Sequence, residues 1–279
     1  MITTSSIKEY RQLTCRLPRP IGFVPTMGSL HEGHLSLVRA ARKDCKTVVV
    51  SVFVNPAQFG PGEDFTTYPR NIEKDGTLLT KEGVDVLFAP AANEIYLPGH
   101  DTWIEAGGMA KRLEGAARPG HFRGVATVVL KLFNIISPDK AYFGQKDAQR
   151  ALVIKKIAQD LNLKIDIETL PTIRTPEGLA LSSRNQYLSN DEKVKALALY
   201  RSLKLAKELY DNGERDASII KTHMQALLSA AGIKTDYISV AGRGSLEELN
   251  LINEEALVLL AGYVGRTRLI DNILLGKQP

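Results

Sequence analysis

The sequence predicts an α/β fold, with a parallel sheet domain followed by a smaller α+β domain. Two observations predict it. Up to Leu170, short apolar runs alternate with helical patterns, which is typical of parallel strands joined by crossover helices. Beyond Leu170 the order changes to two long helical stretches and then three strand-like runs, which is typical of a separate α+β unit.

The strands of the first domain are predicted from apolar runs that are short enough to be buried strands. These runs are 21–24, 47–54, 84–89, 141–143 and 165–170. Right-handed crossovers between them would make one parallel sheet. Ligands of such sheets bind at the carboxyl ends of the strands, so polar residues just after each run are the candidates for a site.

The second domain is predicted to follow a connector, 171–185, that contains Pro, Gly and Ser. Helical patterns at 191–210 and 216–231 precede strand-like runs at 237–240, 256–261 and 266–274. We expect domains at 1–175 and 176–279, with the boundary between 175 and 190, and the second domain packed over the ligand edge of the sheet.

Composition excludes several classes of protein. The 279 residues are 44% hydrophobic and 24% charged, as in ordinary globular proteins. There is no apolar run of membrane-spanning length, and residues 1–10 lack the hydrophobic core of a secretion signal. Cys15 and Cys45 are thirty residues apart and suggest no disulfide framework, so we expect a cytoplasmic protein without a membrane partner.

The net charge of +5 favours anionic small molecules over nucleic acid as partners. A nucleic-acid surface would need Lys and Arg clustered on one face. Here the basic residues are interleaved with Asp and Glu, for example at 191–193 and 204–208.

The most informative motif lies directly after the first predicted strand, at residues 25–35. Small residues and Gly28 lead into an amphipathic helix that carries His31 and His34, and histidines three apart share one helical face. Backbone N–H groups at such a strand-to-helix turn favour an anion. The motif therefore predicts a nucleotide phosphate site.

Other interpretations of this motif remain open. It matches neither a P-loop nor a dinucleotide-binding glycine motif, and H-E-G-H is one residue short of the zinc signature H-E-x-x-H. A metal site and a purely structural role for His31 and His34 stay as alternatives. The H-x-G-H element resembles that of class I aminoacyl-tRNA synthetases and nucleotidylyltransferases, in which the histidines meet ATP phosphates.

Three further clusters lie after predicted strands or in the connector. Asn55 and Gln58 follow the second run and could bind hydroxyl or carbonyl oxygens, although an ordinary Asn-Pro turn explains them too. Lys146 opens a helix that already carries positive potential, which is reasonable if an anion binds there; a solvated lysine is the alternative. Two serines beside Arg184 in the connector could grip phosphate, or form a solvated turn.

Together these segments resemble the pantothenate synthetase (pantoate–β-alanine ligase) family along nearly the full length of the chain. The matching segments are 25–34, 53–60, 142–147 and 181–185. The resemblance implies a Rossmann-like domain, a smaller C-terminal lid domain and a homodimer. It implies ATP and Mg²⁺, a pantoyl-adenylate intermediate formed from pantoate, and attack by β-alanine that releases AMP.

The resemblance also implies roles for individual residues. His34 would be the general acid, His31 a second phosphate contact, Lys146 the group that neutralises the transferring phosphoryl, and Arg184 part of a phosphate clamp. The implied ATP ligands are Met27, Gly28, Ser29, Leu30, His31, Glu32, Gly33, His34, Gly144, Gln145, Lys146, Asp147, Ile173, Leu181, Ser182, Ser183 and Arg184. Gln58 would bind pantoate and reach β-alanine. Asp75 is the nearest candidate for a Mg²⁺-linked aspartate, and the protein's metal ligand is otherwise unknown.

One position departs from the family pattern. The family usually has Lys-Asp-x-Gln-Gln, whereas this chain has Arg150 after Gln149. On a helix, position 150 shares the face of Lys146 while position 149 points elsewhere. Arg150 is therefore expected on the pantoate side.

Two other functions compete with this reading. A different H-x-G-H nucleotidyltransferase, such as a cytidylyltransferase, would share the histidines but would not need Asn55 and Gln58. An RNA-binding synthetase fragment would need a basic stripe, and the region 190–279 is short and mixed in charge.

Overall fold

The computed structural model describes residues 1–276 and divides the chain into two compact units. The N-terminal unit is Met1–Gln145 with Gln149–Pro171. The C-terminal unit is Lys146–Ala148 together with the described chain from Thr172 onward. The short segment Lys146–Ala148 thus belongs to the C-terminal unit although it lies within the sequence of the N-terminal one.

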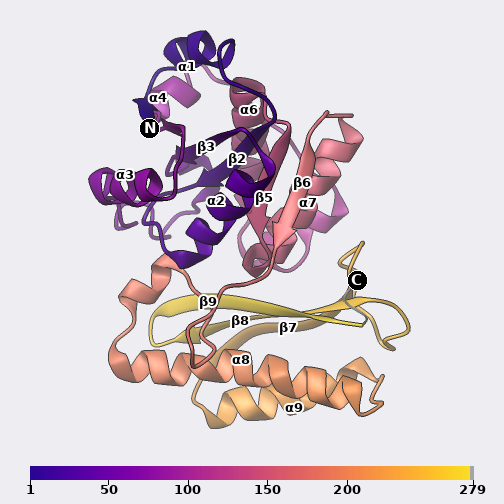
Figure 1. Ribbon diagram of the computed structural model, residues 1–279. Helices are drawn as coiled ribbons and strands as arrows, with labels where there is room; N and C mark the ends of the chain where they lie inside the picture. The colour runs from indigo at the N-terminus through magenta and orange to yellow at the C-terminus, as the bar shows by residue number, and fades with distance from the viewer. Residues whose placement is uncertain (277–279) are drawn as a thin grey trace. The chain divides into compact units, whose positions relative to one another are not determined.

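The N-terminal unit is built on a six-stranded parallel sheet, in the order β1-β4-β3-β2-β5-β6. Strands β2, β3, β5 and β6 are labelled in Figure 1. The strands are β1 Ile2–Thr4, β2 Ile21–Thr26, β3 Thr47–Val52, β4 Val86–Phe88, β5 Lys140–Gly144 and β6 Asp166–Leu170. The predicted fold class, a Rossmann-like α/β sheet domain plus a small α+β domain, is confirmed. Strand β1 was not predicted, because its three residues are too few to form a distinct apolar run.

The central strands β2, β3 and β4 are buried on both faces, which explains why they are continuous apolar runs. Successive residues of a strand point to opposite faces. Phe23 and Val49 pack on the face covered by α1, α6 and α7, whereas Val24 and Val50 pack on the face covered by α2 and α3. The helices of this part are α1 Ile7–Thr14, α2 Glu32–Asp44, α3 Ile72–Lys81, α4 Ala92–Ile95, α5 Glu114–Ala117, α6 His121–Ile136 and α7 Ala148–Asp160, with 3₁₀ turns at Pro56–Gln58, Gly108–Lys111 and Gln145–Asp147.

The C-terminal unit is an antiparallel sheet of three strands, β7 Lys234–Gly242, β8 Ala256–Val264 and β9 Thr267–Leu275, with β8 in the centre. Helices α8 Asn190–Asp211 and α9 Ala217–Ala230 lie along this sheet (Figure 1). A 3₁₀ helix, η4, spans Ser183–Tyr187. The apolar core of the unit joins Leu203 of α8, Ile220 of α9 and Leu260 of β8. Among residues 1–276, no helix is both long and apolar enough to cross a membrane.

Candidate active site

The loop between β2 and α2 is shaped by a buried carboxylate. Gly28 and Ser29 both adopt left-handed backbone angles, with φ of 83° and 53°. Asp75 of α3 accepts the N–H of Ser29 at 2.9 Å and that of Leu30 at 2.8 Å, one on each carboxylate oxygen. A Cβ at residue 28 would lie 2.9 Å from Asp75 Oδ2, so glycine is needed for space as well as for its φ.

The expected cradle of backbone N–H groups for an anion is therefore wrong for most of this loop. Besides the two amides bound by Asp75, the Gly28 N–H donates to Thr26 Oγ1 at 3.2 Å. The amides of His31 and Gly33 donate to imidazoles, and that of His34 donates to the His31 carbonyl. A phosphate at this helix start would be held by side chains and by the helix dipole.

His31 and His34 form a capping box at the start of α2. His31 is the N-cap, in extended backbone, so it precedes the helix and is not part of the helical face predicted from the sequence. Its Nδ1 accepts from the Gly33 N–H at 3.1 Å, and the His34 Nδ1 accepts from the His31 N–H at 3.4 Å. The rings lie together, with centroids 4.1 Å apart. Because Nδ1 accepts in both, the proton of each neutral ring is on Nε2, where it can be donated.

Gln58 comes close to the same loop from the end of the next strand. It lies in the 3₁₀ turn Pro56–Gln58 after β3, is 7% exposed, and its Nε2 approaches Met27 Sδ at 3.0 Å. Asn55 Nδ2 donates to Gln58 Oε1 at 3.1 Å, and Tyr96 OH donates to Asn55 Oδ1 at 2.9 Å. The polar clusters after β2 and β3 thus converge, as expected at the carboxyl ends of adjacent parallel strands.

The turn that carries Gln58 packs directly against α6. A Cβ at Gly124 would lie 2.1 Å from the carbonyl oxygen of Ala57 and 2.7 Å from the nitrogen of Gln58. The Gly124 carbonyl also accepts from Asn55 Nδ2 at 3.1 Å. Helix α6 and the turn can approach this closely only because residue 124 has no side chain.

His121, at the start of α6, holds the main chain of Gln58. Its Nδ1 lies 2.8 Å from the Gln58 carbonyl, and its Nε2 lies 3.2 Å from Arg118 Nη1. A carbonyl only accepts and a guanidinium only donates, so the ring is neutral with its proton on Nδ1. Burial is the largest cause that lowers the His121 pKa, and the positive charges of Arg118 and Arg150 also lower it; the resulting pKa is about 4. Arg118 is itself paired with Glu63 by two bonds of 2.7 and 2.6 Å.

Lys146 follows β5 in a 3₁₀ turn, Gln145–Asp147, directly before α7. Its Nζ lies 3.6 Å from Asp147 Oδ1, and its side chain is 22% exposed. Its carbonyl accepts from Asn272 Nδ2, in β9, at 2.9 Å. The polar cluster predicted after the apolar run 141–143 therefore lies at the end of a strand, β5, and a residue remote in sequence holds the main chain of Lys146.

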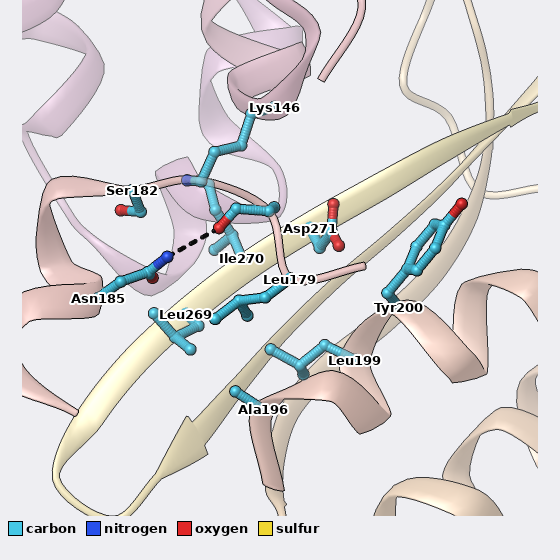
Figure 2. A pocket seen from close by; sticks show the side chains of 11 residues that line it. Lys146, Leu179, Ser182, Asn185, Ala196, Leu199, Tyr200, Leu269, Ile270 and Asp271 are labelled. Carbon is cyan, nitrogen blue, oxygen red and sulfur yellow. Dashed lines mark hydrogen bonds between the residues drawn. The ribbon is translucent and has the colours of Figure 1, made fainter. Parts of the chain in front are cut away.

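The connector residues expected to bind ATP are brought together within the C-terminal unit. The Leu181 N–H donates to the Ile173 carbonyl at 2.9 Å. Ser182 caps η4 by accepting from the Arg184 N–H at 3.3 Å, and Ser183 is buried. A small pocket lies beside this segment (Figure 2). Its lining is Lys146, Leu179, Ala180, Ser182, Asn185, Ala196, Leu199, Tyr200, Leu269, Ile270 and Asp271.

Gln149 and Arg150 differ sharply in their surroundings. Gln149 is 3% exposed and binds backbone groups of the segment that precedes α6: its Oε1 accepts from the Glu114 N–H at 3.0 Å, and its Nε2 donates to the carbonyls of Met109 and Arg112 at 2.9 and 2.7 Å. Arg150 is partly exposed, and its charge acts on His121. Gln149 therefore orders the polypeptide, whereas Arg150 remains the candidate for substrate contact.

The described residues offer no metal centre of their own. Within residues 1–276 there is no group of three or more His, Cys, Asp or Glu that could hold a metal ion. Asp75, the candidate named from the sequence, is 1% exposed and uses both carboxylate oxygens on backbone amides. Its donors do not fit a metal ligand in this arrangement.

Asp271 and Asn272 were not among the residues predicted from the sequence. Their roles rest on partners 97 and 126 positions away in the chain, for which no local pattern gives a signal. A pair of polar residues inside the otherwise apolar run of β9 is the one feature that could have drawn attention to Asp271 and Asn272.

Comparisons with known proteins agree on the family. The family model described as pantoate–β-alanine ligase matches residues 2–274. A pantothenate synthetase of Thermotoga petrophila is 50% identical over 275 residues, which are 98% of this chain and 98% of that protein. A crystal structure of pantothenate synthetase from Thermus thermophilus superimposes with a TM-score of 0.94 at 43% identity, over 98% of this chain and 99% of that one.

A third relative was crystallised with ligands. The pantoate–β-alanine ligase of Francisella tularensis, in complex with βγ-ATP and β-alanine, has a TM-score of 0.83 and 38% identity over 98% of this chain and 97% of that one. The match covers both units of the chain and all the segments described above. The chain belongs to the pantoate–β-alanine ligase family and is a ligase.

Proposed function

We propose that the protein joins pantoate to β-alanine at the expense of ATP, through a pantoyl adenylate, with release of pyrophosphate and AMP. The observation that carries this proposal is the contact of Gln58 with Met27. It brings the end of β3 against the loop after β2, the histidine loop, which leads from Met27 to His31 and His34. A phosphate-binding element beside a neutral amide suits a reaction between a nucleotide and a small hydroxy acid. The ligands of the Francisella relative support ATP and β-alanine as substrates.

The first step is an attack by a carboxylate oxygen of pantoate on the α-phosphorus of ATP. The bond between the α-phosphorus and the bridging oxygen breaks, and pyrophosphate leaves with both bonding electrons. In the second step the amine of β-alanine attacks the acyl carbon, AMP leaves, and the amine gives up a proton. Both steps build negative charge on phosphate oxygens, which preorganised donors stabilise.

The histidine pair supplies such donors. With Nδ1 occupied by a backbone N–H, His31 and His34 each present an Nε2–H, and His34 acts as the general acid toward the leaving pyrophosphate. Lys146 neutralises the transferring phosphoryl group, and Arg184 clamps the phosphates. We propose the full set of ATP contacts as Met27, Gly28, Ser29, Leu30, His31, Glu32, Gly33, His34, Gly144, Gln145, Lys146, Asp147, Ile173, Leu181, Ser182, Ser183 and Arg184.

The substrate side of the site is assigned to Gln58 and Arg150. The buried Gln58 amide, fixed by Asn55 and by the His121 contact to its carbonyl, binds pantoate and then reaches β-alanine. Arg150 offers a forked cation to the pantoate carboxylate. A cation that pairs equally with substrate and transition state lowers the Michaelis constant without raising turnover.

Mg²⁺ is proposed to arrive as part of the substrate, MgATP. The described residues hold no acidic cluster for it, and Asp75 is occupied by the loop. The phosphate oxygens of ATP are the hard donors that Mg²⁺ prefers, and the ion usually keeps several waters.

Isotope exchange tests the adenylate route. With pantoate and MgATP present and β-alanine omitted, labelled pyrophosphate should enter ATP. Omission of pantoate should stop the exchange. Exchange that requires β-alanine would overturn the two-step scheme in favour of a concerted reaction.

We also propose that the protein works as a homodimer in the cytoplasm, with small molecules and not nucleic acid as partners. The family resemblance and the unclustered basic residues support this. Light scattering on the eluting protein would give the mass directly, for comparison with the 30.7 kDa of one chain.

A further inference from the structure

Strand β9 carries two consecutive buried polar residues, Asp271 and Asn272, each 4% exposed. We propose that Asn272 is a positioning residue that fixes the main chain of Lys146 and so aims its ammonium group. This inference rests on the role proposed above for Lys146. It concerns residues of the C-terminal unit alone, because Lys146–Ala148 belongs to that unit.

The contact itself joins the Asn272 amide to the Lys146 carbonyl, with Nδ2 donating at 2.9 Å. A buried amide that loses its acceptor costs free energy, so the bond constrains both partners. Lys146 sits in a 3₁₀ turn of three residues, which has little regular structure of its own to hold it. The hydrogen bond from Asn272 to the Lys146 carbonyl therefore does much to fix the backbone from which the Lys146 side chain projects.

Asn272 is in turn rigidly placed. Its N–H donates to Asp271 Oδ1 at 2.8 Å. Arg174 in turn donates to Asp271 from both terminal nitrogens, Nη1 to Oδ2 at 2.5 Å and Nη2 to Oδ1 at 2.9 Å. The Arg174 guanidinium also lies over the ring of Tyr200, 3.9 Å from its centroid. Figure 2 shows Lys146, Asp271 and Tyr200 around one pocket.

This chain of contacts links two segments that carry proposed ATP ligands. Arg174 directly follows Ile173 in the connector, and Asn272 holds Lys146. Neighbouring residues of a strand point to opposite faces, so β9 can hold the two segments at the same time. The geometry explains why a strand of the C-terminal sheet keeps two adjacent polar side chains in its interior.

A positioning role makes a specific kinetic prediction. If the backbone at Lys146 is released, its ammonium still reaches ATP in the ground state through a flexible stem, but it is badly placed in the transition state. Misplacement of about 1 Å can cost up to about 10²-fold in rate. We expect Asn272→Asp, which keeps the shape but cannot donate to the carbonyl, to lower kcat for pyrophosphate exchange about tenfold, with the Michaelis constant for ATP changed less than about threefold.

A double-mutant cycle separates positioning from general damage. Asn272→Asp is compared with wild type, and again in a Lys146→Ala background. If Asn272 acts through Lys146, the substitution should cost less than about twofold in the second background. An equal loss in both backgrounds, or no loss in the first, would overturn the proposal. Asn272→Ala serves in the same cycle if the aspartate variant does not fold.

Digestion with trypsin tests the restraint without any measurement of enzymatic activity. Trypsin cleaves the peptide bond that follows a lysine, so the carbonyl it attacks after Lys146 is the one that Asn272 holds. Release of that carbonyl should speed cleavage after Lys146 about tenfold, relative to cleavage after the exposed Lys193. Unchanged cleavage would refute the restraint. Faster cleavage with unchanged kcat would refute the link to catalysis. If wild type shows no exchange of pyrophosphate into ATP, the proposed reaction is refuted. Faster cleavage of Asn272→Asp after Lys146 would then still support the restraint.

The matched control is Asp236→Asn. It removes an ion pair with Arg268, 2.8 Å long, in the same sheet, between β7 and β9. Asp236 has no place in the proposed catalytic or binding machinery. Exchange kinetics and cleavage after Lys146 should both match wild type in this variant.

Discussion

His121 gives the structure its clearest pH signature. The neutral ring donates from Nδ1 to the Gln58 carbonyl and accepts at Nε2 from Arg118, so a second proton cannot be added without breaking the contact to Arg118. Replacement by Asn removes the titrating ring and keeps an amide donor near the position of Nδ1. The pH dependence of unfolding should therefore differ between wild type and His121→Asn.

The size of the effect follows from the two pKa values. Burial, followed by repulsion from Arg118, lowers the His121 pKa from 6.5 to about 4 in the folded protein. As the pH falls, the unfolded chain binds the proton first, so the stabilisation is complete above the ordinary pKa and is lost as the pH falls toward the folded one. Linkage gives a loss of about 2 kcal/mol between about pH 7 and about pH 5 from this residue alone.

The assay is urea unfolding followed by the fluorescence of Trp103. This is the single tryptophan of the chain, it lies in the N-terminal unit with His121, and Arg123 of α6 covers its ring at 4.6 Å. Wild type should lose about 2 kcal/mol more than His121→Asn over that pH interval. His223→Asn, at an exposed position of α9, should keep the wild-type dependence. Equal pH dependence in wild type and His121→Asn would refute the neutral, buried assignment of the ring.

Three other sites give further predictions. Asp75→Asn should leave one buried amide of the loop unpaired, which should lower the free energy of unfolding in urea by about 1–3 kcal/mol and also lower turnover. His34→Ala, as a separate variant, should lower turnover about 10²–10³-fold. Gly124→Ala should force α6 from the turn, since its Cβ would meet a carbonyl at 2.1 Å, and raise the Michaelis constant for pantoate by displacing Gln58; an unchanged constant would contradict this. Arg150→Gln should stay active, with pantoate affinity shifted less than about tenfold in substrate titrations. An inactive variant would refute the expectation that the glutamine usual in the family can serve at this position, and equal pantoate affinities in wild type, Arg150→Gln and Arg150→Ala would exclude the proposed contact.

The centre of the sheet could be predicted from the sequence because β2, β3 and β4 are buried on both faces. The short run at 21–24, three apolar side chains and Gly22, predicts a buried strand, and β2 extends from there to Thr26. The same reasoning cannot find β1, whose three residues include two threonines and pair only with β4. Helix α8, Asn190–Asp211, begins and ends within one residue of the helical pattern 191–210, and in the structure Ser189 and Glu192 form a capping box at its start.

The site was predictable in its location and less so in its bonding. Parallel strands bring their carboxyl ends together, so the meeting of Gln58 with the loop of Met27 follows from topology. The topology does not determine which acceptor each backbone N–H group of the loop binds. Asp75 lies 46 positions from Ser29, and no spacing rule links a helix residue to a loop amide at that distance.

The internal bonding of the histidine loop changes how an anion can be recognised there. A loop that offers bare amides must be desolvated and ordered by its ligand, whereas this one is ordered beforehand by Asp75 and by the capping box of His31 and His34. Preorganised donors need no rearrangement as charge develops, which favours the transition state over the bound substrate. Because so many amides are already used, the proposed recognition of phosphate depends on the two imidazole Nε2 atoms, whose tautomer the backbone fixes. The same capping bonds that begin helix α2 thereby decide which ring nitrogen can deliver a proton.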